Sequence, residues 1–280
     1  MFTNKLSNKA TGILAMLAAS VCFALGGLLI KLIPWNALAI NGVRNLIGCL
    51  VVGLYIRLIH HKLRFNRVVL AGMICVGGET TLFTVANKLT TAGNAIVLQY
   101  TAPVWIILMM FLFFGKKPEK REIISILIVL SGILCFFIES LSAGRILGDL
   151  SAVLSGILYG GIYILNRFDD GDTLSSMFLG QLACGILCSP AVRGESNFCP
   201  AVLAAILVLG IVQVGFAFIF LSIGTSRVDP VTASIINALE PVLNPILVAV
   251  FYGETLGPTA ILGAVIVIGA ILFYNITAKK

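Results

Sequence analysis

Ten long apolar segments limit what this chain can fold into. Each has about 20 residues, the length at which a helix crosses the hydrocarbon core of a bilayer. The segments are 10–33, 37–59, 68–87, 93–114, 122–139, 146–166, 173–192, 201–223, 230–252 and 257–277. Because lipid offers no hydrogen-bond partners, each segment must satisfy its own backbone polar groups and is predicted to be a helix. The chain is therefore predicted to be an all-α membrane protein with ten transmembrane helices.

The composition excludes a water-soluble domain and several classes of function. Of the 280 residues, 59% are hydrophobic and 11% are charged, whereas soluble domains carry roughly 25% charge. The net charge of +7 arises from cations in short loops, not from a basic stripe typical of nucleic-acid binding. The seven cysteines form no metal-ligand cluster, and catalytic motifs such as HExxH, GxSxG or a P-loop are absent. We therefore expect no enzyme activity, catalytic residue, cofactor, metal site or nucleic-acid partner.

The positive charges are distributed unevenly between the two sides of the membrane. With the N-terminus in the cytoplasm, 14 of the 19 Lys and Arg residues fall on the cytoplasmic side and 4 on the outer side, while Arg44 lies within a span. The positive-inside rule predicts such a distribution. We expect a multi-pass protein of the cell inner membrane with both termini in the cytoplasm.

The two halves of the chain resemble each other when the second is shifted by 136 to 138 residues. The matched pairs are Gly12 and Gly148, Ser20 and Gly156, Ala24 and Gly160, Lys31 and Arg167, Gln99 and Asn237, Pro103 and Pro241, and Gly132 and Gly269. Each half has five predicted spans, an odd number, so the second half enters the membrane from the opposite side. We predict that residues 1–140 and 141–280 form two inverted five-helix repeats of one membrane domain, which supports alternating access.

Two prolines interrupt long apolar segments at matching positions. Pro103 and Pro241 lie in the fourth and ninth spans, where proline removes a backbone N–H and frees the carbonyl four residues earlier. Those carbonyls belong to Gln99 and Asn237. Broken helices in corresponding places are typical of a solute site between the halves of a transporter. The two amides either bind the solute or only repair the broken hydrogen-bond ladder.

Local sequence strings resemble the drug/metabolite transporter superfamily, EamA type. They are Ala238–Val242 in the ninth span, Phe251–Leu256 after it, Thr101–Val104 in the fourth span and Arg44 in the second. The resemblance covers nearly the whole chain. It implies a fold of two five-helix repeats and a function in the export of amino acids or other small metabolites. The chain departs from the family at Lys116 and Lys117, where the family often has an acidic residue in the place that Glu254 takes in the second half.

Ionisable side chains within spans are candidates for solute binding or coupling. Glu79 is interpreted as a protonatable carboxylate or solute ligand, because burial favours the neutral form; the alternative is a fixed salt bridge with Arg44. Arg44 takes part in coupling, extends outward toward the membrane surface or braces a neighbouring group. Glu240 either lines the cavity or caps the break at Pro241. Pro245 lies four residues after Pro241, which makes this span the best candidate for a hinge.

Aromatic and amide side chains in the spans expected around the cavity complete the predicted site. The predicted solute-binding residues are Glu79, Phe83, Gln99, Tyr100, Trp105, Tyr159, Tyr163, Gln213, Phe216, Asn237 and Glu240, and the predicted coupling and gating residues are Glu79, Arg44, Pro103, Pro241 and Pro245. Lys31 and Arg167 end their spans, and we expect them to extend toward the lipid headgroups.

Together these features predict a secondary transporter that moves a small polar metabolite by alternating access. Export, and an amino acid or similar zwitterion as the leading solute, come from the family resemblance. Arg44 is the one cation deep within a span, against two acids, which favours a neutral, zwitterionic or cationic solute. Protons are a candidate coupling ion. The alternatives are an uptake carrier or exchanger for nucleoside- or sugar-derived metabolites, or a membrane scaffold without transport activity, and the sequence leaves the oligomeric state open.

Overall fold

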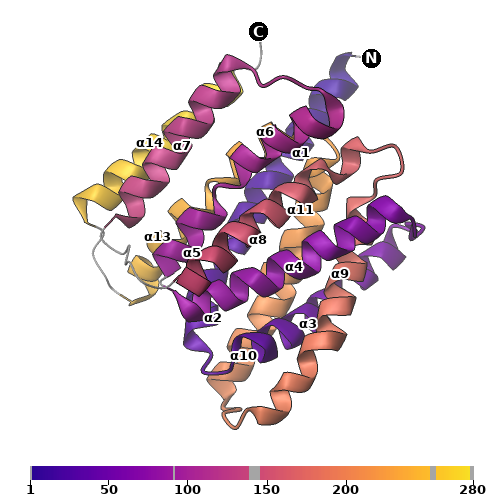
Figure 1. Cartoon of the computed structure of the whole chain (residues 1–280), viewed down its shortest axis with the longest axis vertical. Coiled ribbons are helices and arrows are strands. Elements are labelled where there is room, and N and C mark those ends of the chain that lie inside the picture. The colour runs from indigo at the N-terminus through magenta and orange to yellow at the C-terminus, as the bar shows by residue number, and fades with distance from the viewer. Residues whose placement is uncertain (1, 91, 139–145, 253–256, 278–280) are drawn as a thin grey trace.

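The computed structural model describes residues 2–90, 92–138, 146–252 and 257–277, and within these ranges it is built of helices and short connections without strands (Figure 1). The elements in chain order are α1 (Phe2–Phe23), α2 (Gly26–Leu32), α3 (Ala37–Leu58), α4 (Arg67–Leu89), α5 (Ala92–Gln99), α6 (Ala102–Phe114), α7 (Lys120–Phe137), α8 (Ile146–Ile164), η1 (Leu165–Arg167), α9 (Thr173–Cys188), η2 (Ser189–Gly194), α10 (Pro200–Val208), η3 (Leu209–Phe216), α11 (Ala217–Thr225), α12 (Pro230–Asn237), α13 (Glu240–Tyr252) and α14 (Pro258–Thr277).

Seven helical stretches of the described residues are long and apolar enough to cross a membrane. They are Asn8–Leu32, Ala37–Leu58, Arg67–Leu89, Asn94–Phe114, Ile146–Arg167, Thr173–Gly194 and Pro200–Thr225, and a shorter apolar stretch covers Ile261–Tyr274. Large apolar side chains on their outer faces are exposed, such as Leu50 at 75% and Leu187 at 79%, as expected where lipid is the solvent. The prediction of an all-helical membrane protein is confirmed, while ten spans in inverted repeats stay a prediction.

Polar side chains begin several of these helices at the loops. The side chains of Asn36, Asn66 and Asp229 each accept a hydrogen bond from a backbone N–H in the first turn of α3, α4 and α12. These bonds satisfy N–H groups that have no partner within the helix. Gly115 ends α6 with a φ of 63°, a left-handed conformation that favours glycine. The short loops therefore fix where each span begins and ends.

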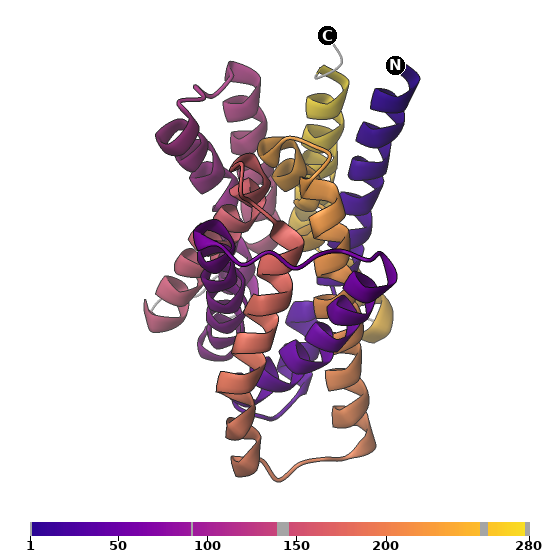
Figure 2. The same ribbon diagram turned by 90° about the vertical axis from the view of Figure 1, so that its right-hand side faces the viewer.

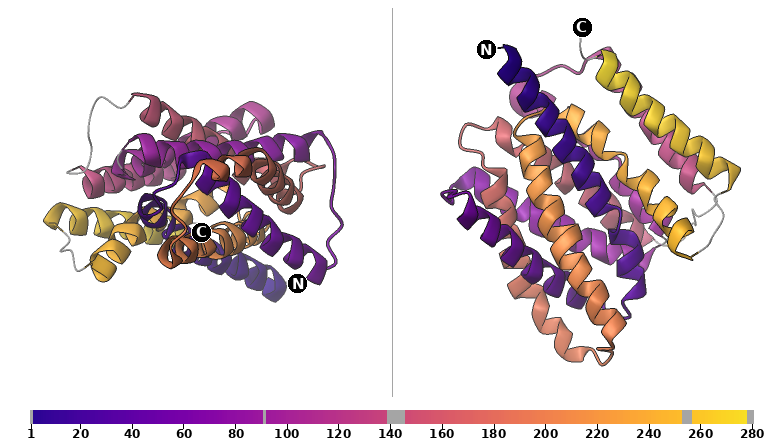
Figure 3. Two further views of the ribbon diagram at one scale, coloured as in Figure 1. Left: turned by 90° about the horizontal axis from the view of Figure 1, so that it is seen from below. Right: turned by 180° about the vertical axis from the view of Figure 1, so that it is seen from behind.

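Helices of the first half pack against helices of the second half. The helix α3 packs against α9, and α7 packs against α14, which runs beside it along one edge of the molecule (Figure 1). The helix α4 packs against α8 and α9, while α1 packs against α11 (Figure 3) and α3 against η3. The start of α1 and the end of α14 lie at the same end of the molecule (Figure 2). The two halves are thus interleaved and share one core.

Both proline-containing spans are broken at the predicted positions. The helix α5 ends at Gln99 and α6 begins at Ala102, while α12 ends at Asn237 and α13 begins at Glu240. The residue before each break and the residue after it are therefore separated from their counterparts in the other half by the same number of residues. The prediction of two broken helices in corresponding places is confirmed. Pro245 lies inside α13 and does not end it.

Helix α8 passes directly along the first break through two glycines. A Cβ atom on Gly156 would lie 2.6 Å from the carbonyl oxygen of Gln99, and one on Gly160 would lie 3.4 Å from the carbonyl oxygen of Ala102. A distance of 2.6 Å is shorter than any ordinary contact, so the break packs against α8 only because Gly156 has no side chain.

A pair of glycine substitutions tests this contact. We expect Gly156→Ala to lower the melting temperature of the purified protein in detergent, because overpacking a fixed backbone atom costs about 1–3 kcal/mol. A Cβ atom on Gly269, in helix α14, would have no atom of the described residues within 4 Å. Gly269→Ala therefore serves as the matched control and should not lower the melting temperature. Equal melting temperatures of the two variants would contradict the packing described.

Candidate functional site

A small polar cavity lies where the two helix breaks face each other. Its volume is about 10 Å³, which is the space for about one water molecule. Its lining residues are Phe23, Arg44, Glu79, Thr80, Phe83, Gln99, Tyr159, Gln213, Phe218 and Glu240. These residues come from α1, α3, α4, α5, α8, η3, α11 and α13, so both halves of the chain contribute. The cavity is closed in this conformation.

Arg44 lies against the cavity with its guanidinium bonded to the protein on every nitrogen. Nη1 donates to the side-chain oxygen of Gln213 at 3.0 Å. Nη2 donates to the carbonyl oxygen of Thr80 at 2.9 Å and to the hydroxyl of Thr84 at 2.7 Å. Nε and Nη2 also donate to Asn41 Oδ1. With 1% of its surface exposed, Arg44 ties α3 to α4 and η3.

Glu79 and Gln99 meet across the first break. The side-chain amide of Gln99 donates to Oε1 of Glu79 at 2.9 Å, and both side chains are buried. The fixed salt bridge between Glu79 and Arg44 that we considered is not formed: the ion pairs of the described residues lie elsewhere, although these two side chains line the same cavity. The amide of Gln99 therefore donates to the carboxylate of Glu79 and does not replace a missing backbone hydrogen bond of its own helix.

Asn237 connects the second break to three other elements. Its amide nitrogen lies 2.9 Å from the hydroxyl of Tyr159, 3.2 Å from the hydroxyl of Tyr100 and 3.2 Å from Glu240 Oε2, so its two N–H groups are shared among three acceptors. The hydroxyl of Ser20 donates to Asn237 Oδ1 at 3.1 Å. The amide thus joins α1, α8 and the first break to the second.

The carbonyl that Pro241 frees has a partner from the first break. Tyr100, which lies between α5 and α6, places its hydroxyl 2.9 Å from the carbonyl oxygen of Asn237 and 2.6 Å from Oε2 of Glu240. The single hydroxyl proton is donated to one of these two acceptors at a time. A residue of one break therefore satisfies a carbonyl or carboxylate at the other.

An aromatic wall closes the remaining side of the cavity. The ring of Phe23 meets the rings of Phe218 and Tyr159 edge-on, with centroids 5.3 Å and 6.2 Å apart. Tyr163, predicted as a solute contact, packs edge-on against Tyr159 at 5.1 Å but does not line the cavity. Phe23, Phe218 and Thr80 line the cavity without having been predicted, since nothing in the sequence distinguishes them from the other Phe and Thr residues.

Two predicted aromatic contacts lie away from the cavity. The side chain of Phe216 is 44% exposed, and Trp105 is half-buried with its indole N–H donating to Thr101 at 3.2 Å. Phe216 ends a π-helix, Leu209–Phe216, in which each residue turns by less than in an α-helix. Faces assigned from α-helical spacing are therefore shifted, and Phe218 occupies the inward place expected for Phe216.

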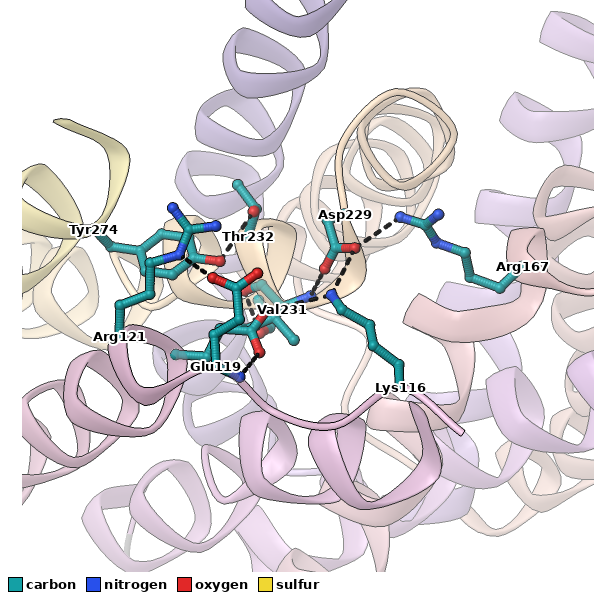
Figure 4. A network of polar contacts seen from close by, with 10 residues as sticks. Lys116, Glu119, Arg121, Arg167, Asp229, Val231, Thr232 and Tyr274 are labelled. Carbon is teal, nitrogen blue, oxygen red and sulfur yellow. Dashed lines mark hydrogen bonds and ion pairs between the residues drawn. The ribbon is translucent and has the colours of Figure 1, made fainter. Parts of the chain in front are cut away.

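Ion pairs join the loops at the end of the molecule where α1 starts and α14 ends. The carboxylate of Asp229 lies 2.9 Å from Nη2 of Arg167 and 3.2 Å from Nζ of Lys116 (Figure 4). Nζ of Lys116 also pairs with Glu122 at 3.3 Å. Burial opposes the charge on Lys116, but Asp229 and Glu122 outweigh it and raise the pKa of this lysine. We call Arg167, Asp229 and Lys116 the inner latch. It borders an open cavity of about 510 Å³.

A similar group lies at the start of the other broken helix. Lys31 Nζ donates to the carbonyl oxygen of Thr90 at 3.0 Å, and the Thr90 hydroxyl donates to Asp149 Oδ1 at 2.9 Å. We call Lys31, Thr90 and Asp149 the outer latch. Arg167 and Lys31 therefore bind the residues that precede α12 and α5. Both side chains are exposed, and their extension toward lipid headgroups stays a prediction.

A charge-conserving substitution tests the network around Arg44. We expect Arg44→Lys to lower the free energy of unfolding by about 1–3 kcal/mol, because one ammonium cannot replace the separate donors that reach Gln213, Thr80 and Thr84. Arg57 lies in the last turn of the same helix with an exposed side chain, so Arg57→Lys is the control. Melting temperatures in detergent would argue against this network if Arg44→Lys were as stable as its control.

The chain is similar to known proteins along most of its length. The profile of the EamA-like transporter family matches residues 10–138 and residues 146–276. An uncharacterized transporter of Clostridium kluyveri is 26% identical over 75% of this chain and 72% of its own length. An uncharacterized protein of Pseudomonas aeruginosa is 24% identical over 92% of this chain and 91% of its own length. A crystal structure with 18% sequence identity superposes with a TM-score of 0.78 over 97% of this chain and 99% of that one, which shows a shared fold.

Proposed function

The chain belongs to the EamA-like transporter family, and we propose that it is a secondary transporter of the inner membrane that moves a small polar metabolite by alternating access. Family membership makes it a multi-pass membrane transporter of small solutes. One observation carries the finer proposal: two broken helices, one in each half, meet at a closed and buried polar cavity. Broken helices whose polar ends face a cavity are how transporters hold solutes inside a bilayer.

Residues 1–140 and 141–280 are proposed to be two inverted repeats of five spans each. The contacts of corresponding glycines support this pairing. A Cβ on Gly148 would lie 2.9 Å from the backbone nitrogen of Thr90, and one on Gly12 would lie 2.7 Å from Cβ of Arg227. Each glycine thus packs under the loop that precedes a broken helix. The paired packing of α3 with α9 and of α7 with α14 also fits a two-fold relation in the membrane plane.

The two latches are proposed to be the gates of this transporter. Each holds the residues before a broken helix to the other half of the chain: Thr90 to Asp149 before α5, and Asp229 to Lys116 before α12. With both latches formed, the cavity has room for about one water, which corresponds to an occluded state. Opening one latch at a time would expose the cavity to one side of the membrane, with the inner latch and both termini in the cytoplasm.

The proposed solute is an amino acid or a similar zwitterion, moved outward. Two buried carboxylates, Glu79 and Glu240, face a guanidinium whose nitrogens are all bonded to the protein, which disfavours an anionic solute such as a nucleotide-derived metabolite. Uptake or exchange remains the alternative direction. A scaffold without transport activity would not need a buried polar cavity, because burying such groups in a membrane is costly.

Weakening the inner latch should open the cytoplasmic side of the cavity. Ser20 is fully buried and bonded to Asn237, so a cysteine placed there in a chain without its native cysteines reports on opening. We expect Asp229→Asn to raise labelling by an impermeant maleimide in inside-out vesicles about two- to tenfold, because each partly exposed ion pair contributes roughly 0.2–1 kcal/mol. Asp169→Asn, at an exposed loop carboxylate, is the control. Unchanged labelling would show that Asp229 does not hold the gate.

Flux through the purified protein in liposomes tests transport and its coupling. A panel of labelled amino acids and other polar metabolites is screened with a pH-sensitive dye inside the liposomes. We expect one or more solutes to cross and to drive proton flux, and we expect this proton flux to be lost in Glu79→Gln, because the amide cannot take up a proton. Asp169→Asn should behave like the unmodified chain. If no solute crosses, transport is refuted; if Glu79→Gln retains proton flux, only coupling through Glu79 is.

A further inference from the structure

Two carboxylates, one from each half of the chain, line the closed cavity, and each uses one oxygen for its bonds to the protein. Glu79 and Glu240 are 6% and 8% exposed. Gln99 donates to Oε1 of Glu79, while Tyr100 and Asn237 donate to Oε2 of Glu240. Among the described residues, nothing donates to Oε2 of Glu79 or Oε1 of Glu240. Both side chains line the cavity, so these two oxygens are suited to accept hydrogen bonds from a bound solute.

The charges around the cavity do not balance without a further positive charge. With both carboxylates ionised, Arg44 compensates one of the two negative charges. Its donors are already committed to Gln213, Thr80 and Thr84, so it does not supply the remaining hydrogen bonds. A surplus buried charge is costly in a membrane. One proton or one monovalent cation would remove the surplus.

The aromatic wall favours an organic cation over a metal ion. Rings of Phe23, Phe83, Tyr159 and Phe218 line the same cavity as the carboxylates. Aromatic faces attract ammonium groups, whereas hard metal ions take six or more oxygen ligands. The described residues contain no group of three or more His, Cys, Asp or Glu side chains arranged to hold a metal. The remaining donor is therefore best supplied by an ammonium group with an apolar body.

We propose that the cavity binds a small organic ammonium through Glu79 and Glu240, and that one proton leaves the carboxylate pair as one such cation enters. The proposal rests on the proposed transport function, and it replaces the zwitterion suggested there as the leading solute with an amine that lacks the carboxylate. A solute carboxylate would have to break the bonds of Arg44, so an amine should bind more tightly than the amino acid that differs from it by one carboxylate.

Other ionisable groups near the pair are accounted for in this exchange. They are Arg44 on α3, Cys184 on α9, Tyr159 and Tyr163 on α8, and Tyr100 at the first break. Arg44 is bonded to Gln213 and Thr80, and the thiol of Cys184 lies within hydrogen-bond distance of Asn41 and Thr81. The hydroxyls of Tyr100 and Tyr159 hydrogen-bond to Glu240 and Asn237, and Tyr163 packs against the ring of Tyr159. Among the ionisable groups around the cavity, only the two carboxylates line it with an oxygen that no described residue donates to, so the exchanged proton is assigned to them.

Matched sets of three compounds test the proposal on the full chain in detergent. Phenethylamine, phenylalanine and 3-phenylpropionate share one apolar body and carry a cation, a zwitterion and an anion; butylamine, norvaline and pentanoate form a second set. Binding is measured with labelled compounds, and proton release is measured with an indicator dye in weak buffer. We expect the amine of at least one set to bind about tenfold or more tightly than its partners, with up to one proton released for each amine bound.

Variants and salts separate the carboxylates from other causes. We expect Glu79→Gln and Glu240→Gln each to weaken amine binding about tenfold or more, Glu79→Asp to retain part of it, and Asp169→Asn to leave it unchanged. Should a glutamine variant fail to fold, proton release by the unmodified protein still decides the matter. The proposal is overturned if no amine binds, if anions or zwitterions bind as tightly, if binding releases no proton, or if sodium ions displace the amine at equal concentration. Amine binding without flux in liposomes would instead refute transport alone.

Discussion

The Tyr100 hydroxyl, whose one proton is shared between the Asn237 carbonyl and the Glu240 carboxylate, makes the contact on which the rest of this structure depends. It joins the two helix breaks directly, since Tyr100 lies within the first and Asn237 ends the helix before the second. A carbonyl freed by proline inside a membrane needs a partner, because lipid supplies none. Here the partner comes from the opposite half of the chain, so the halves cannot separate at the cavity without exposing polar groups that something else must satisfy.

That constraint explains why the cavity is polar and yet closed. Arg44 donates to Gln213, Gln99 donates to Glu79 and Asn237 donates to Tyr159, so these polar groups are bonded to the protein and not to water. The aromatic rings fill the remaining volume. A solute that replaces some of these bonds lowers the cost of opening, whereas opening without a solute leaves buried groups unsatisfied at about 1–3 kcal/mol each. Solute binding is therefore coupled to opening because the solute replaces hydrogen bonds that opening breaks. The two latches determine which end of the cavity opens.

The helix breaks could be predicted from the sequence because they depend on local residues. The latches could not, because they depend on contacts between residues that are distant in the sequence. Pro103 and Pro241 each remove a backbone N–H and free the carbonyl four residues earlier, and the matched amides that carry those carbonyls mark the two places in the sequence. Pro245, which has no matching proline in the other half, lies within α13 without ending it. Span-end cations gave no such signal. Arg167 binds a carboxylate 62 residues away, and Lys116, which departs from the family pattern, gains its role from the same Asp229. Such partners are set by how loops meet, which spacing along one helix does not reveal.

The aromatic side of the cavity was predicted less well than its polar side. Glu79, Gln99, Gln213 and Glu240 could be selected because a polar group within a span requires a reason. An aromatic residue requires none, so Phe23 and Phe218 could not be separated from the remaining phenylalanines. In the π-helix before Ala217 each residue turns by less than in an α-helix, so the face that points inward differs from the one expected from α-helical spacing. Phe216 therefore lies on the outer side of the helix.

Distances between spin labels across the two ends of the molecule test the alternating movement most directly. One pair of labels at Lys117 and Ser226 spans the inner latch, and another at Leu89 and Leu150 spans the outer latch; all four side chains are exposed. Measured in lipid nanodiscs across a range of pH and with bound solute, the two distances should change in opposite directions, one lengthening as the other stays short. Two distances that stay fixed under all conditions, or that lengthen together, would contradict the account.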